Sequence, residues 1–271
     1  MCAIRASGTS VVKITANITG TDDNAGIQAY DNADVIVTGN ITVGDNWSTG
    51  IYADGKAKVT VSGNIEVGDN WSTGICAEDN AKVTVTGNIT VKDGDEGYGM
   101  GLFAQDKADV TVKGNITVTS DYGRGIRTWG EAVVNFTGNM TVTGTLGHGI
   151  SAWDDTVITI KGNITVSGFE SYGIYFGDAA KITMVGKLTV TGDDSEYVVL
   201  WYDDDESEVY VFFPPTEPVK SGGYWVYADE NSDAILKMKE SDGGLDTMMI
   251  LLIAVVALVV IAAAAFFFLK K

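Results

Sequence analysis

Residue types that often carry function are scarce in this 271-residue chain, which has two cysteines, three arginines and one histidine. Cys2 and Cys76 cannot build a disulfide framework. Cys76 stands where Tyr52 stands one repeat earlier, so we expect a free thiol. The scarcity of arginine and the formal net charge of −18 exclude a nucleic-acid-binding face, because phosphates are bound by Lys and Arg. The acidic balance is typical of a soluble, self-repelling exterior.

The N-terminus also lacks a targeting signal. Residues 1–10 contain no charged n-region, no apolar run and no small-residue cleavage site. The repeat pattern already begins at VVKITANITG, and the terminal coils of a repeat protein normally need a polar cap. We therefore expect either that Met1 is not the natural start or that the chain is the membrane-proximal part of a longer protein.

One phrase recurs through the chain: an alternating strand, a Gly-Asn corner and a second strand. Its copies are VIVTGNITV, KVTVSGNIEV, KVTVTGNITV, DVTVKGNITV, VVNFTGNMTV, VITIKGNITV and KITMVGKLTV. The corner glycines are spaced by 24 residues with one step of 27, at Gly39, Gly63, Gly87, Gly114, Gly138, Gly162 and Gly186. A fixed period in this range predicts a solenoid.

Each repeat provides three short strands with an apolar side that recurs in columns. Alternation in Ala81 to Thr86 places Val83 and Val85 on one face, and Gly87-Asn88 turns the chain, since both residue types tolerate φ > 0. The same apolar residues return at each position, as in Val35, Val59, Val83, Val110, Val134, Ile158 and Ile182. One coil cannot bury enough surface to stand alone, so stacking is obligatory.

The period and its columns resemble the right-handed parallel β-helix of pectin-lyase-like proteins and many surface adhesins, over about residues 11–191. The resemblance implies an all-β solenoid with 24-residue coils and three short strands per coil. With a C-terminal anchor, the arrangement is similar to adhesin-like surface proteins of archaea and bacteria. The resemblance specifies the fold well and the function poorly.

The C-terminal segment predicts one transmembrane α-helix. Residues 248–269 contain no charge, and as a helix they would span about 33 Å. Lys270 and Lys271 follow as stop-transfer residues and favour the cytoplasmic side, so we expect a single-pass cell-surface protein with the solenoid outside. The expected domains are β-helix repeats at 1–191, degenerate coils forming a cap at 192–240, a linker at 241–247, the helix at 248–269 and the cytoplasmic lysines at 270–271.

Several motifs that suggest chemistry are better explained by the repeat. Gly147-His148-Gly149 resembles a stretch of the polygalacturonase active site, but its second glycine recurs in every coil, and the companion motifs are missing. Acidic loops such as Asp93 to Glu96 could bind Ca²⁺, yet they match no known calcium motif, so we expect solvated surface and no cofactor. We find no convincing catalytic constellation and expect no enzymatic activity.

Sequons are numerous, and most arise from the Gly-Asn corner itself. We expect the corner asparagines to hydrogen-bond one another as a ladder that hides them from a glycosyltransferase. Asn46 and Asn70 lie in loops and are the better candidates for glycosylation in an exported chain.

Aromatic residues are the candidate binding feature. Trp47, Trp71, Tyr98 and Tyr122 each lie three residues before an opening-strand glycine, and Trp129 pairs with Trp153 in a second column. Stacked aromatics on a solvent face can bind glycan rings, with Arg124 and Arg127 nearby to hydrogen-bond hydroxyls or acids.

The sequence therefore predicts a membrane-anchored, adhesin-like, extracellular β-helix. Its partners would be the membrane, through the C-terminal helix, and glycans or surface proteins, through a lateral face. The alternatives are a polysaccharide lyase or hydrolase on the same fold, or a truncated gene fragment without independent function. A convergent acidic-basic cleft would favour the enzyme, and uniform flat faces would favour the adhesin.

Overall fold

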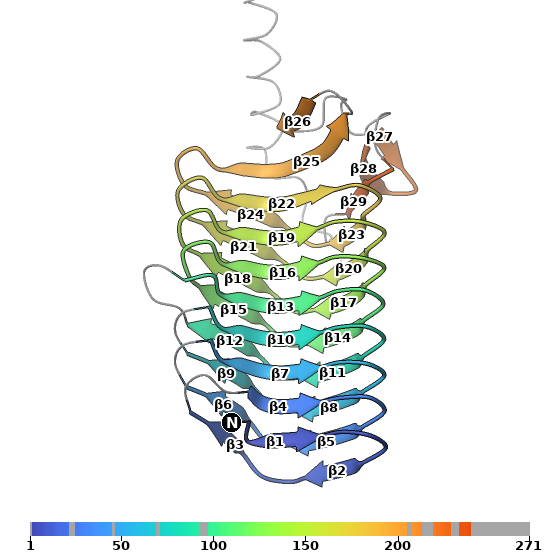
Figure 1. Ribbon diagram of the computed structural model, residues 1–271. Coiled ribbons are helices and arrows are strands. Elements are labelled where there is room, and N and C mark those ends of the chain that lie inside the picture. The colour runs from blue at the N-terminus through green and yellow to red at the C-terminus, as the bar shows by residue number, and fades with distance from the viewer. Residues whose placement is uncertain are drawn as a thin grey trace, which may run out of the picture. The chain divides into compact units, whose positions relative to one another are not determined.

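Each repeat of the sequence forms one coil of three strands in the computed structural model (Figure 1). The structure describes residues 2–21, 25–44, 47–68, 71–92, 97–204, 207–212, 219–228 and 233–239, all within one compact unit, Met1–Lys239. In Figure 1 the chain crosses the front from left to right, returns behind and rises by one coil, which is a right-handed course.

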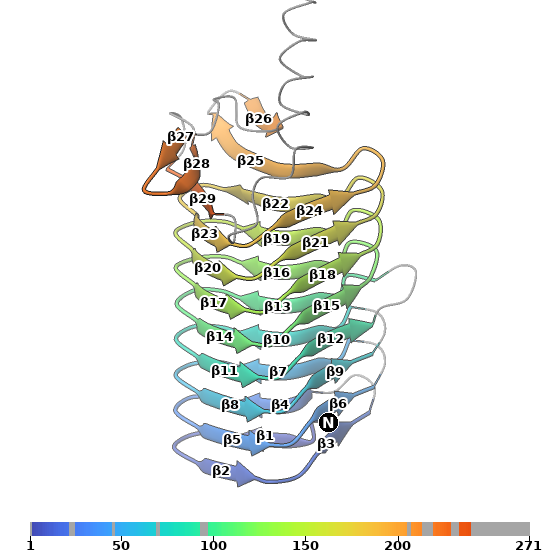
Figure 2. The same ribbon diagram turned by 180° about the vertical axis from the view of Figure 1, so that it is seen from behind.

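The strands build three sheets, named A, B and C here (Figures 1 and 2). In spatial order, sheet A contains β1 (Ile4–Ala6), β4 (Ala25–Ala29), β7 (Thr49–Ala53), β10 (Thr73–Ala77), β13 (Met100–Ala104), β16 (Arg124–Thr128), β19 (His148–Ala152), β22 (Tyr172–Gly177), β25 (Glu196–Asp204) and β26 (Ser207–Phe212). Sheet B contains β2 (Val11–Ile14), β5 (Asp34–Thr38), β8 (Lys58–Ser62), β11 (Lys82–Thr86), β14 (Asp109–Lys113), β17 (Val133–Thr137), β20 (Val157–Lys161), β23 (Lys181–Val185), β29 (Ile235–Lys239), β28 (Tyr224–Ala228) and β27 (Val219–Ser221). Sheet C contains β24 (Leu188–Thr191), β21 (Ile164–Ser167), β18 (Met140–Thr143), β15 (Ile116–Thr119), β12 (Ile89–Lys92), β9 (Ile65–Val67), β6 (Ile41–Val43) and β3 (Ile18–Gly20).

The predicted columns of apolar residues form the core. Strands of successive coils pair in parallel, so Ile75 lies between Ile51 and Leu102, and Val83 lies over Val59. The inward residues of all three sheets are essentially inaccessible to solvent. Because like stacks on like at about 4.8 Å per coil, the repeat in the sequence becomes the register of the sheets.

The Gly-Asn corner has a different role for each residue. Gly87 adopts φ +150°, and a Cβ there would lie 2.1 Å from the carbonyl oxygen of Gly63, so only glycine fits. Asn88 does not adopt a positive φ; its Oδ1 accepts a hydrogen bond from the backbone N–H of Asn115 at 2.8 Å. The same bond recurs from coil to coil and forms the predicted ladder. The corner asparagines are solvent-exposed, so whether the ladder keeps them from a glycosyltransferase stays a prediction.

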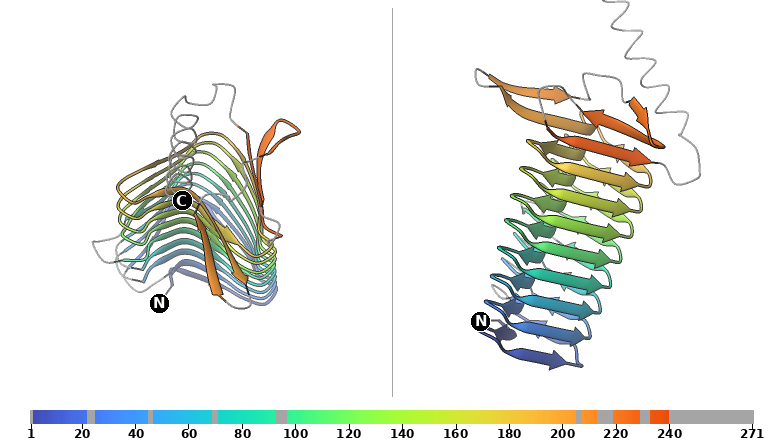
Figure 3. Two further views of the ribbon diagram at one scale, coloured as in Figure 1. Left: turned by 90° about the horizontal axis from the view of Figure 1, so that it is seen from above. Right: turned by 90° about the vertical axis from the view of Figure 1, so that its right-hand side faces the viewer.

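The repeat ends in antiparallel strands (Figure 3). Sheets A and B each gain one further parallel strand, because β25 pairs with β22 and β29 pairs with β23. Sheet C ends at β24, so the last coil has two parallel strands among the described residues. Antiparallel pairing of β26 with β25, and of β27 and β28 beside β29, then extends the two sheets.

No helix in the described part of the chain is long and apolar enough to cross a membrane. The predicted linker 241–247, the predicted transmembrane helix 248–269 and the lysines at 270–271 lie outside the described residues. The same holds for the candidate glycosylation sites Asn46 and Asn70 and for the acidic loop at 93–96.

Candidate ligand-binding face

The outer face of sheet A differs from the outer faces of sheets B and C. Outward residues of sheets B and C include exposed threonines such as Thr60 and Thr42. On β7, β10, β13, β16, β19 and β22 of sheet A the first and fourth residues point outward, and most of them are aromatic, basic or sulfur-containing side chains. These outward residues of sheet A include Tyr52, Cys76, Met100, Phe103, Arg124, Arg127, His148, Ser151, Tyr172 and Tyr175. Each is at least partly buried by its neighbours.

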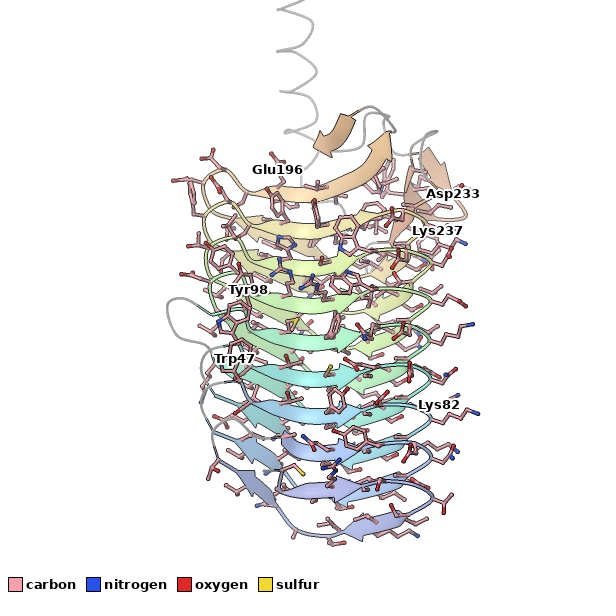
Figure 4. All side chains as sticks on the ribbon, in the orientation of Figure 1. Trp47, Lys82, Tyr98, Glu196, Asp233 and Lys237 are labelled. Carbon is pink, nitrogen blue, oxygen red and sulfur yellow. The ribbon has the colours of Figure 1, made fainter. Side chains whose placement is uncertain are left out.

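The first predicted aromatic column is a continuous stack along one edge of this face. The ring of Trp47 lies 5.1 Å from that of Trp71 with an interplanar angle of 7°, and Trp71 lies 4.3 Å from Tyr98. Tyr98 and Tyr122 continue the stack at 4.8 Å. Figure 4 shows Trp47 and Tyr98 at the side where the strands of sheet A begin. We call Trp47, Trp71, Tyr98 and Tyr122 the edge column.

Solvent exposure is greatest at the N-terminal end of the edge column. Trp47 is 63% exposed and Trp71 is 44% exposed, which is unusual for tryptophan. The backbone holds Trp47, Trp71 and Tyr122 at φ between 51° and 60°, a conformation uncommon for bulky residues. Leu146 adopts the same positive φ in a later coil, so this backbone geometry is a feature of the repeat. The aromatic side chains at the position are specific to the coils that contain the edge column.

The two tryptophans of the second predicted column pack against outward residues of sheet A. Trp129 packs edge-on against Phe103 of the preceding coil at 5.5 Å, while Trp153 packs against Tyr175 of the following coil at 5.1 Å. The indole N–H of Trp153 donates to the hydroxyl of Ser151 at 3.2 Å. Both tryptophans therefore turn toward the outer face of sheet A and border it opposite the edge column.

Two arginines and a histidine lie between these aromatic borders. The register places Arg124 beside His148 and Arg127 beside Ser151 on adjacent strands. Arg124 donates from Nη1 to the carbonyl oxygen of Tyr122 at 2.7 Å, and its guanidinium lies 5.9 Å from the Tyr98 ring centroid. Arg127 lies over the Trp129 ring at 4.3 Å. We call Arg124, Arg127 and His148 the Arg–His cluster.

The electrostatics of the Arg–His cluster are dominated by burial, and none of the ion pairs found among the described residues includes it. Burial and the two nearby arginines lower the pKa of His148 to about 3, so its imidazole is neutral at physiological pH. Burial, followed by repulsion from Arg127, lowers the pKa of Arg124 to about 10. The ion pairs among the described residues join lysines to carboxylates elsewhere on the surface. Nε of Arg124, Nε of Arg127 and Nδ1 of His148 are buried and have no hydrogen-bond partner in the part of the chain that the structure describes.

Sequence reasoning placed both arginines near the stacked aromatics but set His148 aside. In the structure Arg124 contacts Tyr98 and Tyr122 of the edge column, and Arg127 contacts Trp129. The repeat explains Gly149, since a Cβ there would lie 2.5 Å from the carbonyl oxygen of Gly173. It does not explain His148, whose ring packs against Tyr172 at 5.0 Å and Tyr175 at 5.3 Å. The spacing could have placed His148 beside Arg124, because His148 follows Arg124 by one period and occupies the same outward position.

Other chemically suggestive groups on this face are internally paired. The thiol of Cys76 and the hydroxyl of Tyr52 both donate to the carboxylate of Glu78, at 3.5 and 2.7 Å. Burial, with the Glu78 charge, raises the pKa of the Cys76 thiol. In the part of the chain that the structure describes, no group of three or more His, Cys, Asp or Glu residues could hold a metal ion.

Comparison with known families agrees with this architecture. A family model described as a right handed beta helix region matches residues 2–165, more than half of the chain. The chain belongs to this family. In the structure the β-helix continues beyond the matched region, through β24 at Thr191. No curated protein and no solved structure gives a significant match, so the function of this β-helix has to be argued from its surface.

Proposed function

We propose that this β-helix is an adhesin-like, non-enzymatic surface protein that binds glycans through the outer face of sheet A. In this proposal residues 248–269 anchor it in a membrane, with the solenoid outside and Lys270 and Lys271 inside. The anchoring part is supported by the uncharged run of 22 residues and the lysines that follow it.

The observation that carries the binding part is the exposed, stacked edge column. Large aromatic surfaces left in water are unfavourable, and a contiguous patch of them typically marks an interaction site. The stacked rings of Trp47, Trp71 and Tyr98 follow the solenoid axis, and consecutive ring centroids are 5.1 and 4.3 Å apart. Because the rings are stacked on one another, the column presents a series of apolar ring edges to a long partner, and coil stacking keeps the rings fixed before binding.

The alternative is a polysaccharide lyase or hydrolase on the same fold. Most glycoside hydrolases use two carboxylates about 5–9.5 Å apart. The Arg–His cluster contains no carboxylate. Glu196 occupies the same outward position as Arg124 and His148, but it lies two strands beyond His148. This arrangement favours binding over hydrolysis. Two other possibilities are that the face binds another protein or that the chain has no independent role. The absence of glycan binding in the test below would favour them.

A glycan array tests the binding proposal. The wild-type chain should bind a set of glycans, and Trp47→Ala with Trp71→Ala should lose most of that binding. Trp129→Ala and Trp153→Ala should also weaken it, because these residues border the same face. Thr84→Ala, on the outer face of sheet B, serves as the matched control and should bind like the wild type. Binding that persists in all four tryptophan variants would refute this face as the platform.

A labelling experiment on intact cells tests the proposed orientation. A membrane-impermeant lysine reagent should modify exposed lysines of the solenoid, such as Lys82, without permeabilisation. A tag placed after Lys271 should become accessible only after permeabilisation. Labelling of the tag on intact cells would contradict the proposed topology.

A further inference from the structure

The Arg–His cluster contains three buried nitrogen atoms that have no hydrogen-bond partner among the described residues. The chain has 36 acidic residues and 18 lysines and arginines, so there are enough carboxylates to pair with every arginine. Instead two of its three arginines, Arg124 and Arg127, lie on the same strand, β16, and both point to the outer face of sheet A. The ion pairs among the described residues all involve lysines. Partly burying two like charges without a counter-ion is unfavourable. The fold itself gains nothing evident from that placement.

The cation–π contacts offset only part of this cost. Trp129 lies under the Arg127 guanidinium at 4.3 Å, and Tyr98 and Phe103 lie about as far from the two arginines as such contacts extend. Ring faces do not accept the in-plane N–H groups as oxygen does. The Nε atoms of both arginines and Nδ1 of His148 therefore still lack a partner among the described residues.

The cluster is nevertheless held in position. Arg124 is fixed by its bond to the Tyr122 carbonyl, and His148 is packed edge-on against Tyr172 and Tyr175. His148 is 8% exposed, whereas both arginines are partly exposed on the outer face. Preorganised guanidinium groups beside a neutral imidazole form a set of hydrogen-bond donors with net positive charge. The chemical group that complements such a set is an anion with several oxygen atoms.

We infer that the Arg–His cluster is a binding site for the acidic group of a sugar, a carboxylate or a sulfate ester, and that the glycan bound along sheet A is therefore acidic. This inference rests on the proposed glycan-binding function and adds the class of ligand. The edge column and the two bordering tryptophans contact the rings of the saccharide, and the cluster between them selects its charge.

The single histidine makes the site directly observable. In a chain labelled with ¹³C-histidine, one Cε1–H resonance reports on His148 and on nothing else. Methyl glucuronide and methyl sulfate should shift this resonance in a saturable way, and methyl glucoside, which lacks the acid, should not. Arg124→Gln and Arg127→Gln should each weaken the apparent affinity for methyl glucuronide about tenfold or more, because each removes a charge-assisted contact. Arg5→Gln, at the other end of sheet A, is the matched control and should leave the affinity unchanged.

The outcomes separate this inference from the proposed function. An unmoved His148 resonance with methyl glucuronide and methyl sulfate overturns the acidic site. Equal shifts with glucoside and glucuronide overturn it as well. If the acidic site fails while array binding still depends on Trp47 and Trp71, the glycan-binding proposal survives with a neutral ligand. A shift of His148 that Arg124→Gln and Arg127→Gln leave unchanged shows an adventitious ion only and also overturns the site.

Discussion

His148 should make the stability of this protein fall as the solution becomes acidic. Its pKa is about 3 in the folded chain and about 6.5 when exposed in the unfolded chain. Below pH 6.5 the unfolded state binds a proton that the folded state rejects, so the free energy of unfolding decreases as pH falls toward 3. Above pH 6.5 both states are neutral at this residue, and the effect disappears.

The magnitude follows from the width of that window. One pH unit corresponds to about 1.4 kcal/mol for a group protonated in only one state. Between pH 6.5 and pH 4, His148 should therefore cost about 3 kcal/mol of unfolding free energy. His148→Gln removes the titrating ring and should reduce the loss of stability between pH 7 and pH 4 by about this amount.

Urea unfolding at pH 7 and pH 4 measures the effect. The wild type and His148→Gln share all other titrating groups, so the difference between their pH dependences isolates the imidazole. Met100→Gln changes the same outward column two coils earlier without removing a titrating group, and it should keep the wild-type pH dependence. An equal loss of stability in the wild type and His148→Gln would refute the buried, neutral imidazole.

Two further predictions concern the corner and the thiol. Gly87→Ala should destabilise the protein by about 3 kcal/mol or more, as measured by urea unfolding, since it adds a left-handed strain and a backbone collision. Gly8→Ala, at φ +66° with open space around its Cβ, should cost only about 1–2 kcal/mol, and equal costs would contradict the stacking argument. In a Cys2→Ser background at pH 8, Cys76 should react with a thiol reagent far more slowly in the folded chain than in guanidinium, because burial keeps it protonated. Equal rates in the two states would show that the thiol is not shielded.

The coils could be predicted closely because each position is constrained by its neighbours in adjacent coils. Val83 lies over Val59 and Ile89 over Ile65, so a period in the sequence translates directly into contacts. The asparagine ladder followed from the same logic. The antiparallel strands after Thr191 were not predicted, because the period is lost there and only tertiary pairing sets their partners.

The candidate face was predictable only in part, for a related reason. The four residues of the edge column each lie three residues before the opening-strand glycine in successive coils, so their stacking could be inferred from spacing alone. The partners of Trp129 and Trp153 depend instead on which outward side chains border them, and those differ from coil to coil. His148 was set aside because the glycine of the motif at Gly149 belongs to the repeat, whereas the position of His148 beside Arg124 depends on the preceding coil.

The central claim is that the outer face of sheet A binds an acidic glycan, and the structure of a complex tests it most directly. Crystals of the β-helix grown with a glucuronic-acid-containing oligosaccharide should show sugar rings against Trp71 or Trp129. A carboxylate oxygen should lie within hydrogen-bond distance of Arg124 or Arg127. Oligosaccharide bound instead on the outer face of sheet B or sheet C, with the Arg–His cluster unchanged, would contradict the account.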